Sequence, residues 1–397
     1  MLETRIAKEL AYISQAGLAR RITELYFVNP AQAQDRTGKT YLVLASNNYL
    51  GFTHAPEVIE AASRAALKFG TGSSGSRLTT GGTFIASELE KRLADFKHSE
   101  SALVFNTGYM TNLGVLYGLM QTGDVVFSDE LNHASIIDGC RISRCKVVVY
   151  KHNDMADLQR LLETEIVTGQ RFIVTDGVFS MDGDIADLPS LAVLKKQFNA
   201  CLIVDDAHGV GVIGNDGSGT ASHYGLTDVI DLQVGTLSKA LAAEGGYVAG
   251  KKILIDYLIN RSRPFIFSTA LAPATLAAAN AALLLLQTQA SKYLDSLRAN
   301  SRLMRRLLLE GGLNVVEGIT PIIPVVIGEA ELTMQFADRL KSKGILVSGI
   351  RPPTVPRGES RLRITVTAAH CEEQLRQAAQ IITALWQELK HGEKKEG

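Results

Sequence analysis

The feature that most constrains the fold of this chain is an alternation of short apolar runs with helix-like segments between about residue 100 and residue 235. Each apolar run ends in a polar or glycine-rich turn. Strands of this kind, rich in β-branched residues and separated by helices, are typical of a mostly parallel sheet with both faces covered. The low aromatic content of 6% and the 35 glycines favour an α/β enzyme over an all-β sandwich. The predicted strands are 102–105, 124–127, 146–150, 172–176, 202–206 and 231–235.

The domain organisation follows from where this alternation begins and ends. Residues 1–25 have the apolar spacing of an amphipathic helix. A long charged helix is predicted over 291–310, and the strands and final helix after it indicate a smaller α+β domain. The length of 397 residues is sufficient for these separate cores. We therefore predict an N-terminal helix and short strands over 1–45, a large domain over 46–290, and a small C-terminal domain over 291–397.

Charge and composition exclude several classes of partner. The chain has 41 Lys and Arg residues and 41 Asp and Glu residues, so it lacks the positive charge of a nucleic-acid-binding domain. Its four cysteines form no CxxC pair, and neither a disulfide framework nor a metal site is expected. The N-terminal residues do not resemble a signal peptide, and the apolar stretch 270–286 is interrupted by Pro273 and Asn280. We expect a cytoplasmic protein with no membrane partner.

Two strand ends carry the residues most suited to chemistry. Asp205, Asp206 and His208 follow one apolar strand, and Lys239 follows the next in a turn of small residues. In open α/β sheets, ligands bind beyond the carboxyl ends of the strands. Taken singly, the acid could pair with an arginine or cap a helix, and the lysine could simply start a helix. Together they match pyridoxal phosphate chemistry, in which a lysine forms a Schiff base with the cofactor aldehyde and an acid keeps the ring nitrogen protonated.

Nine ordered segments carry a resemblance to a known family. The chain resembles the α-oxoamine synthases, which are pyridoxal phosphate enzymes of fold type I, from about residue 15 to residue 385. This resemblance implies an aspartate-aminotransferase-like large domain with a mostly parallel seven-stranded sheet, a smaller α+β C-terminal domain, and a homodimer with shared active sites. The matching segments are ASNNYLGF (45–52), GTGSSGSR (70–77), NTGYMTN (106–112), LNHASIIDG (131–139), TDGVFSMDGD (175–184), VDDAHGVGVIG (204–214), GTLSKAL (235–241), RSRPFIFSTA (261–270) and RPPTVPRGESRLRIT (351–365).

The resemblance implies roles for the residues around the cofactor ring. Lys239 would form the Schiff base, and Asp205 would pair with the pyridine nitrogen. His208 and Ser180 would hydrogen-bond the phenolic oxygen, and His133 would stack on the ring face. Of these, Lys239, His133, Asp205 and His208 are the predicted catalytic residues.

The cofactor phosphate would be bound at a helix start. The amides of Gly108 and Tyr109 would face it at the positive end of the helix, and Thr236 would add a hydroxyl. Ser268 and Thr269 would contribute hydroxyls from the partner subunit, because the family builds its sites across a homodimer interface.

The substrate side requires cations for carboxylates. The resemblance assigns the amino-acid carboxylate to Arg363, with help from Asn47. The guanidinium fork suits that task better than an ammonium group does. Arg20 and Arg21 both match a substrate-contacting position, of which Arg21 is favoured, and Thr354 lies on a loop that closes over the substrate.

One departure from the family pattern follows the lysine. Many members carry glycine where this chain has Ala242 and Ala243. The added methyl groups would narrow the site slightly, but they remove no chemical group.

The segments most resemble the members that condense L-alanine with a pimeloyl thioester in biotin synthesis, releasing CO2 and a free thiol. The sequence does not decide between pimeloyl-CoA and pimeloyl-acyl-carrier protein as donor. The leading alternative is the sibling reaction of glycine with acetyl-CoA, which forms 2-amino-3-ketobutyrate. A third hypothesis is a non-catalytic partner or regulator, but such a chain would be expected to lack Lys239.

Overall fold

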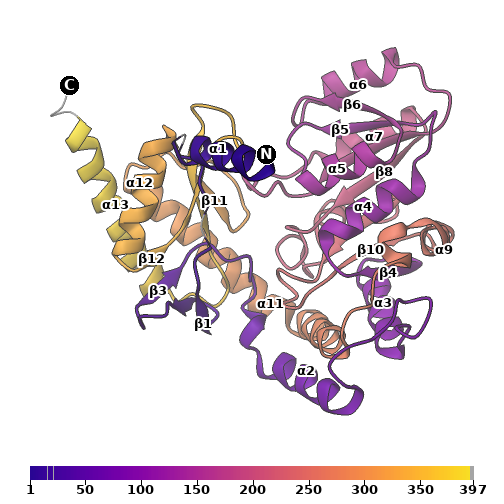
Figure 1. Ribbon diagram of the computed structural model, residues 1–397, viewed down its shortest axis with the longest axis horizontal. Coiled ribbons are helices and arrows are strands. Elements are labelled where there is room, and N and C mark those ends of the chain that lie inside the picture. The colour runs from indigo at the N-terminus through magenta and orange to yellow at the C-terminus, as the bar shows by residue number, and fades with distance from the viewer. Residues whose placement is uncertain (16, 21, 394–397) are drawn as a thin grey trace.

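The computed structural model describes residues 1–15, 17–20 and 22–393, arranged as two lobes connected by a long helix (Figure 1). The large lobe is built on a seven-stranded sheet in the order β4-β10-β9-β8-β7-β5-β6. Strands β5 to β9 pair in parallel, whereas β10 is antiparallel to both of its neighbours. The strands are β4 (Ser101–Phe105), β5 (Val125–Asp129), β6 (Lys146–Tyr150), β7 (Arg171–Asp176), β8 (Ala200–Asp205), β9 (Leu232–Thr236) and β10 (Gly246–Gly250).

The mostly parallel seven-stranded sheet expected from the family resemblance is confirmed, and the six strands predicted from the sequence are β4 to β9. The seventh strand, β10, was not predicted from the sequence. It is the five-residue segment GYVAG, and glycine at both ends is more typical of a turn than of a strand. Its burial between β4 and β9 holds it in the sheet despite this low intrinsic preference.

Helices cover both faces of the sheet, as the strand pattern predicted. One face packs against α4 (Gly108–Leu119), α5 (Ala134–Ile142), α9 (Lys252–Arg261) and α10 (Arg263–Ile266). The other packs against α2 (Pro56–Phe69), α3 (Phe84–Phe96), α6 (Met155–Thr164), α7 (Leu188–Gln197), α8 (Thr220–His223) and the first half of α11 (Pro273–Glu310). Within β5, Val126 faces one core while Val125 and Phe127 face the other. Alternate side chains of a strand point to opposite faces, so these strands are buried on both sides.

The small lobe combines both ends of the chain. An antiparallel sheet of β11 (Ile322–Gly328), β14 (Ser360–Thr365) and β13 (Ser348–Ile350) packs with α12 (Ala330–Ser342) and α13 (Glu372–Glu393). Its second sheet has the order β1-β2-β3-β12 and joins β1 (Tyr26–Asn29), β2 (Gln32–Gln34) and β3 (Thr40–Val43) to β12 (Ile345–Leu346). The short 3₁₀ turn Phe52–His54 then leads into the large lobe.

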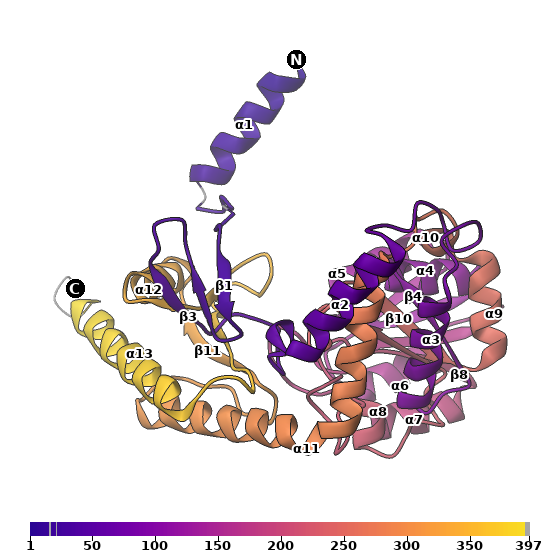
Figure 2. The ribbon, with the colours of Figure 1, turned by 90° about the horizontal axis from the view of Figure 1, so that it is seen from below.

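Helix α11 runs through both lobes and bends between them (Figure 2). Gln289 has φ −133° and ψ 27°, which interrupts the helical geometry. Leu283 belongs to the core of the large lobe, whereas Met304 and Leu308 belong to that of the small lobe. The domain boundaries at residues 45 and 290 stay a prediction.

The predicted N-terminal helix is shorter than expected and stands clear of both lobes (Figure 2). Helix α1 (Leu2–Gln15) buries no residue. The prediction that it extends to residue 25 was wrong, because Gly17 takes the left-handed φ of 67° that ends helices. No helix in the described part of the chain is both long enough and apolar enough to cross a bilayer.

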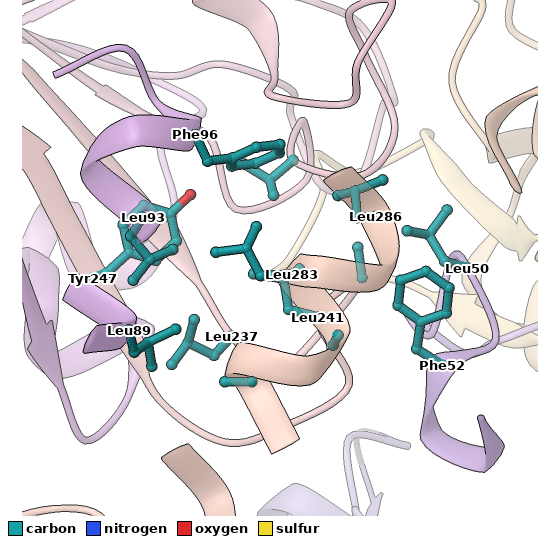
Figure 3. Close-up of a cluster of buried hydrophobic side chains, with 14 of the residues drawn as sticks. Leu50, Phe52, Leu89, Leu93, Phe96, Leu237, Leu241, Tyr247, Leu283 and Leu286 are labelled. Carbon is teal, nitrogen blue, oxygen red and sulfur yellow. The ribbon is translucent and has the colours of Figure 1, made fainter. Parts of the chain in front are cut away.

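The largest core supports the turn that carries Lys239. Figure 3 shows Leu237 and Leu241 from this turn packed among Leu89, Leu283 and other buried side chains. Leu237 and Leu241 are both fully buried. The lysine is therefore held on a turn that is anchored on both sides by apolar packing.

A buried ion pair lies within the same lobe. Lys97 Nζ is 3.0 Å from Asp206 Oδ2, and both side chains are almost inaccessible, with exposed fractions of 0% and 1%. The Asp206 carboxylate also accepts hydrogen bonds from the backbone and hydroxyl groups of Thr220. From the sequence, an acid at this strand end could also have a structural partner such as an arginine. Asp206 is that acid, but its partner is the lysine Lys97.

We predict that Lys97→Met destabilises the protein by about 3–5 kcal/mol, because it leaves a buried carboxylate without its cation. The measurement is the urea unfolding midpoint. Adding Asp206→Asn should restore part of the loss by removing the unpaired charge. Lys252→Met is the matched control, since the Lys252–Asp256 pair is exposed and should be worth less than about 1 kcal/mol. Equal losses in the two single variants would contradict the prediction.

Candidate active site

The carboxyl ends of three neighbouring strands meet at one edge of the large sheet. Asp176 ends β7, Asp205 ends β8 and Thr236 ends β9. Beside them is a cavity of about 190 Å³. It is lined by Thr107, Gly108, Tyr109, Asn112, His133, Ser135, Asp176, Ser180, Asp205, Ala207, His208, Thr236, Ser238 and Lys239. The structure therefore brings together all four predicted catalytic residues.

Asp205 is a buried carboxylate held by polar groups. Asn112 Nδ2 donates to Asp205 Oδ2 at 2.6 Å, and the amide of Ala207 donates to Oδ1 at 3.0 Å. Asn112 also donates to Ser135 Oγ at 2.8 Å. These bonds fix the orientation of the carboxylate. The role of Asn112 was missed, although it closes the matched segment NTGYMTN.

Asp176 is a second buried carboxylate that the sequence interpretation did not select. Its Oδ2 accepts a hydrogen bond from the backbone amide of His133 at 2.9 Å. Burial, together with the neighbouring charge of Asp205, raises the pKa of Asp176 well above its usual value. This shift favours the protonated form of Asp176. The sequence signal that could have identified Asp176 is its position at the end of the predicted strand 172–176.

The Lys239 amine lies in the same cavity. Burial lowers the pKa of Lys239, although the carboxylates of Asp205 and Asp176 favour its charged form. A depressed pKa makes a lysine amine a better nucleophile and base near neutral pH. Ala242, just after the lysine, has a φ of 53°. Glycine adopts this left-handed conformation at a lower cost than alanine does.

Both histidines in the cavity have a lowered pKa. Burial is the main cause for His208, and the cations Lys239 and Arg363 add to it, so that its pKa falls well below the usual value. His208 Nδ1 lies 2.6 Å from the hydroxyl of Tyr49, and burial raises the pKa of that tyrosine to about 12. His208 is therefore a neutral ring oriented by a neutral phenol. Burial also lowers the pKa of His133, which caps α5 and lies 2.7 Å from Ser135 Oγ.

The N-terminus of α4 closes one side of the cavity. Thr107 caps this helix by accepting from the amide of Met110 at 3.0 Å. The first amides of a helix have no partner within it and attract anions, and those of Gly108 and Tyr109 are in this position. A side chain at Gly246 would place its Cβ 2.6 Å from Gly108 Cα. Only glycine allows β10 to approach the start of α4 so closely.

Hydroxyl groups face this helix end from the lysine turn. Thr236 Oγ1 lies 2.7 Å from Ser238 Oγ and accepts from the amide of Ser238 at 3.2 Å. Thr236 was a predicted cofactor residue, whereas Ser238 was missed although it immediately precedes Lys239. The Thr236 hydroxyl donates to the carbonyl of Gly245 at 3.0 Å, so it would have to turn to join the helix amides as a donor to a phosphate group.

Arg363 reaches this region from the small lobe. Its guanidinium donates to the carbonyl of Ser180 at 2.5 Å, to Thr365 Oγ1 at 3.0 Å and to Asn47 Oδ1 at 3.2 Å. Arg363 is 6% exposed on β14. The structure thus joins the predicted pair Arg363 and Asn47, and it attaches Arg363 to the loop that carries Ser180.

Five predicted site residues do not line the cavity, and a sixth lies outside the described residues. Two of the five are Arg363 and Asn47, whose contacts are given above. Ser268 and Thr269 are instead next to the 73–76 segment, where Thr269 pairs with Ser76 in an isolated bridge. Thr354 is exposed, while its neighbours Arg351 and Pro352 line a larger cavity of about 1020 Å³ beside α12. Arg21 is the residue outside the described part of the chain.

The donor set in the cavity fits pyridoxal phosphate. It supplies an amine for an aldehyde, a buried carboxylate for a ring nitrogen, and amides and hydroxyls for a phosphate. Within the described residues, no cluster of three or more His, Cys, Asp or Glu side chains could hold a metal ion.

Comparison with known proteins gives consistent matches over most of the chain. The family model "Aminotransferase class I and II" matches residues 39–382. An 8-amino-7-oxononanoate synthase from Trichlorobacter lovleyi is 50% identical over 385 residues, covering 97% of this chain and 98% of that protein. A protein of the same name from Lysinibacillus sphaericus is 47% identical over 374 residues, covering 94% of this chain and 96% of the relative.

Solved structures match the chain as well. A structure of serine palmitoyltransferase with a pyridoxal phosphate internal aldimine has a TM-score of 0.92 at 32% identity, and the match covers 97% of each chain. The structure of 8-amino-7-oxononanoate synthase from Francisella tularensis has a TM-score of 0.75 at 30% identity, covering 89% of this chain and 98% of that one. The chain therefore belongs to the class I and II aminotransferase family and, within it, to the α-oxoamine synthases.

Proposed function

We propose that this protein is a pyridoxal phosphate-dependent acyltransferase that condenses L-alanine with a pimeloyl thioester in biotin synthesis. The products are 8-amino-7-oxononanoate, CO2 and a free thiol. The observation that carries the proposal is the identity of 47% to 50% with 8-amino-7-oxononanoate synthases over 94% to 97% of this chain. The geometry of the cavity supports it, since an amine, a buried carboxylate and an anion-binding helix start converge there.

Pyridoxal phosphate, when bound, supplies an aldehyde that takes up the amino group of the substrate and a ring that accepts the electron pair left by a broken Cα bond. Lys239 would hold the cofactor covalently between turnovers. Once displaced by alanine, its amine would remove the Cα proton, and burial, which lowers the pKa of Lys239, favours the uncharged amine that this step needs. The apolar anchors Leu237 and Leu241 keep this amine in place.

The carboxylate of Asp205 would hold a proton on the ring nitrogen. Its bonds from Asn112 and from the amide of Ala207 keep it oriented for that contact. His208 and Ser180 would face the phenolic oxygen. Because the pKa of His208 is low, it would act as a neutral hydrogen-bonding group. His133 would stack on the ring face.

Arg363 would bind the alanine carboxylate, with Asn47 orienting the guanidinium. A bidentate contact of this kind fixes the rotation of the substrate about the Cα–N bond. The same contact would therefore align the Cα–H bond for proton removal.

The remaining parts of the site are proposed on the same basis. The amides of Gly108 and Tyr109 and the Thr236 hydroxyl would bind the phosphate. Ser268 and Thr269 lie outside the cavity, as expected if they serve the partner's site in a homodimer. Arg21 and Thr354 stay proposals for substrate contact, and a cytoplasmic location stays a prediction.

The function is tested by measuring thiol release from pimeloyl-CoA, pimeloyl-carrier protein, acetyl-CoA and succinyl-CoA, each combined with alanine, glycine and serine. We expect turnover with alanine and a pimeloyl donor. Turnover only with glycine and acetyl-CoA would establish the alternative reaction, and absence of turnover with every pair would support a non-catalytic role.

We predict that Lys239→Ala abolishes the visible absorbance of lysine-bound cofactor and lowers thiol release by at least about 10³-fold, since both the covalent anchor and the base are lost. Spectra and turnover are recorded on the purified protein supplied with cofactor. Lys196→Ala changes an exposed lysine on α7 and serves as control. An unchanged spectrum or rate in the Lys239 variant would refute the assignment.

A second prediction concerns Asp205→Asn. The amide cannot stabilise a protonated ring nitrogen, so deuterium exchange at alanine Cα should slow by about 10²–10³-fold. Exchange is followed by proton NMR in D2O without an acyl donor. Asp205→Glu keeps the charge and should retain more activity than the asparagine variant. Normal exchange in Asp205→Asn would rule out the proposed role.

A further inference from the structure

The segment from Val178 to Ile185, called here the 178–185 hairpin, links the cofactor cavity to the small lobe. Val178 and Ile185 form an antiparallel bridge, and the amide of Phe179 donates to the carbonyl of Asp184 at 3.0 Å. Gly183 closes the turn with a φ of 70°, and a Cβ there would lie 2.8 Å from the carbonyl oxygen of Ile322. The hairpin is thus closed on itself and directly against β11.

On the side of the large lobe, His152 fixes the hairpin. Its Nε2 lies 2.9 Å from Asp184 Oδ2, and its Nδ1 lies 3.0 Å from Asp129 Oδ1 at the end of β5. Burial opposes the charge on this ring, but the hydrogen bonds to both carboxylates outweigh it and raise the pKa of His152 to about 10. At neutral pH the charged ring therefore fastens one arm of the hairpin to the sheet.

On the side of the small lobe, β14 binds the hairpin through two arginines. Arg363 donates to the carbonyl of Ser180, and the guanidinium of Arg361 forms an ion pair with Asp182. Residues two apart on a strand share a face, so both guanidinium groups meet the same hairpin. The Arg361 side chain is only 4% exposed, compared with 28% for Asp182. This pair is thus a charged contact between the lobes, with a buried guanidinium and a partly exposed carboxylate.

The position of the hairpin affects substrate binding because Arg363, the proposed carboxylate ligand, is hydrogen-bonded to the hairpin backbone at Ser180. Where the hairpin lies against β14 determines where the Arg363 guanidinium lies relative to Lys239. Thr320 on the small lobe also contacts the hairpin, because it donates to the carbonyl of Gly183 at 2.8 Å, but this hydrogen bond joins two uncharged groups. The Arg361–Asp182 pair is an ionic contact that holds β14 and the hairpin together beside Ser180.

We propose that Arg361 is a positioning residue: by binding Asp182 it fixes the 178–185 hairpin against β14 and so sets where Arg363 holds the amino-acid carboxylate. Arg361 acts through Arg363 and does not itself contact the substrate. The inference rests on the proposed function, because it takes the carboxylate of the amino acid as the ligand of Arg363.

The test uses the holoenzyme and three variants: Asp182→Asn, Arg361→Lys and Arg361→Gln. The dissociation constant of L-alanine is measured from the change in cofactor absorbance, in parallel with cofactor affinity, kcat and KM. Glycine is titrated as well, so that a wrong choice of amino acid is recognised. Glu359→Gln is the matched control, since Glu359 binds the same guanidinium at 3.1 Å but precedes β14 and is 56% exposed.

We expect Asp182→Asn and Arg361→Gln to weaken alanine binding by about tenfold while cofactor affinity stays within twofold, because displacing a binding group by a fraction of an ångström has effects of this size. Arg361→Lys should fall between wild type and Arg361→Gln. The double variant Asp182→Asn/Arg361→Gln should be no weaker than the worse single variant, as expected for two groups that act as one unit. Glu359→Gln should bind alanine normally.

The proposal is overturned if Asp182→Asn binds alanine within twofold of wild type, or if Glu359→Gln weakens binding as much as the hairpin variants do. It is also overturned if cofactor affinity falls in step with alanine affinity, since that pattern indicates general damage. Should Arg361→Gln fail to fold, the partly exposed Asp182 still provides the decisive variant. Thiol release by the wild-type enzyme tests the proposed function separately, because alanine affinity is measured without any acyl donor.

Discussion

The site depends on the parallel register of β7, β8 and β9. In that register Asp176 is paired with Asp205, and Asp205 with Val234 on the next strand. Two carboxylates are thereby brought together in a buried place, which strongly disfavours charging both. Repulsion between the two carboxylates contributes to the raised pKa of Asp176. Asp205 is stabilised by the hydrogen bonds that it accepts from Asn112 and from the amide of Ala207. The cation Lys239 lies in the same cavity. The register of the sheet therefore places two carboxylates side by side in the cavity.

The tandem acids at the end of β8 show how one strand serves two purposes. Successive side chains point in opposite directions, so Asp205 faces the cavity while Asp206 faces Lys97 in the interior. Asp206 also binds both polar groups of Thr220, which begins α8. The charge of Asp206 is therefore balanced by Lys97 on the side away from the cavity.

Much of this arrangement could be predicted from the sequence because it depends on local patterns. Six of the seven strands are apolar runs with recognisable ends, and Lys239 and Asp205 follow two of them. Asn112 and Asp176 were missed because their importance arises from contacts with residues distant in sequence, such as Asp205 and His133. The strand β10 was missed because its place is fixed by its neighbours in the sheet.

The pairing of the two ends of the chain in the small lobe has a consequence for synthesis. Strand β3 finds its outer partner only in β12, where Leu42 pairs with Ile345. On a ribosome that completes the chain from the N-terminus, β3 must wait for β12 until the whole large lobe and part of the small lobe have been made. During that interval an apolar strand edge is open to neighbouring chains, and such edges promote aggregation. The large lobe can fold as it emerges, whereas the small lobe closes only after β12 has been made.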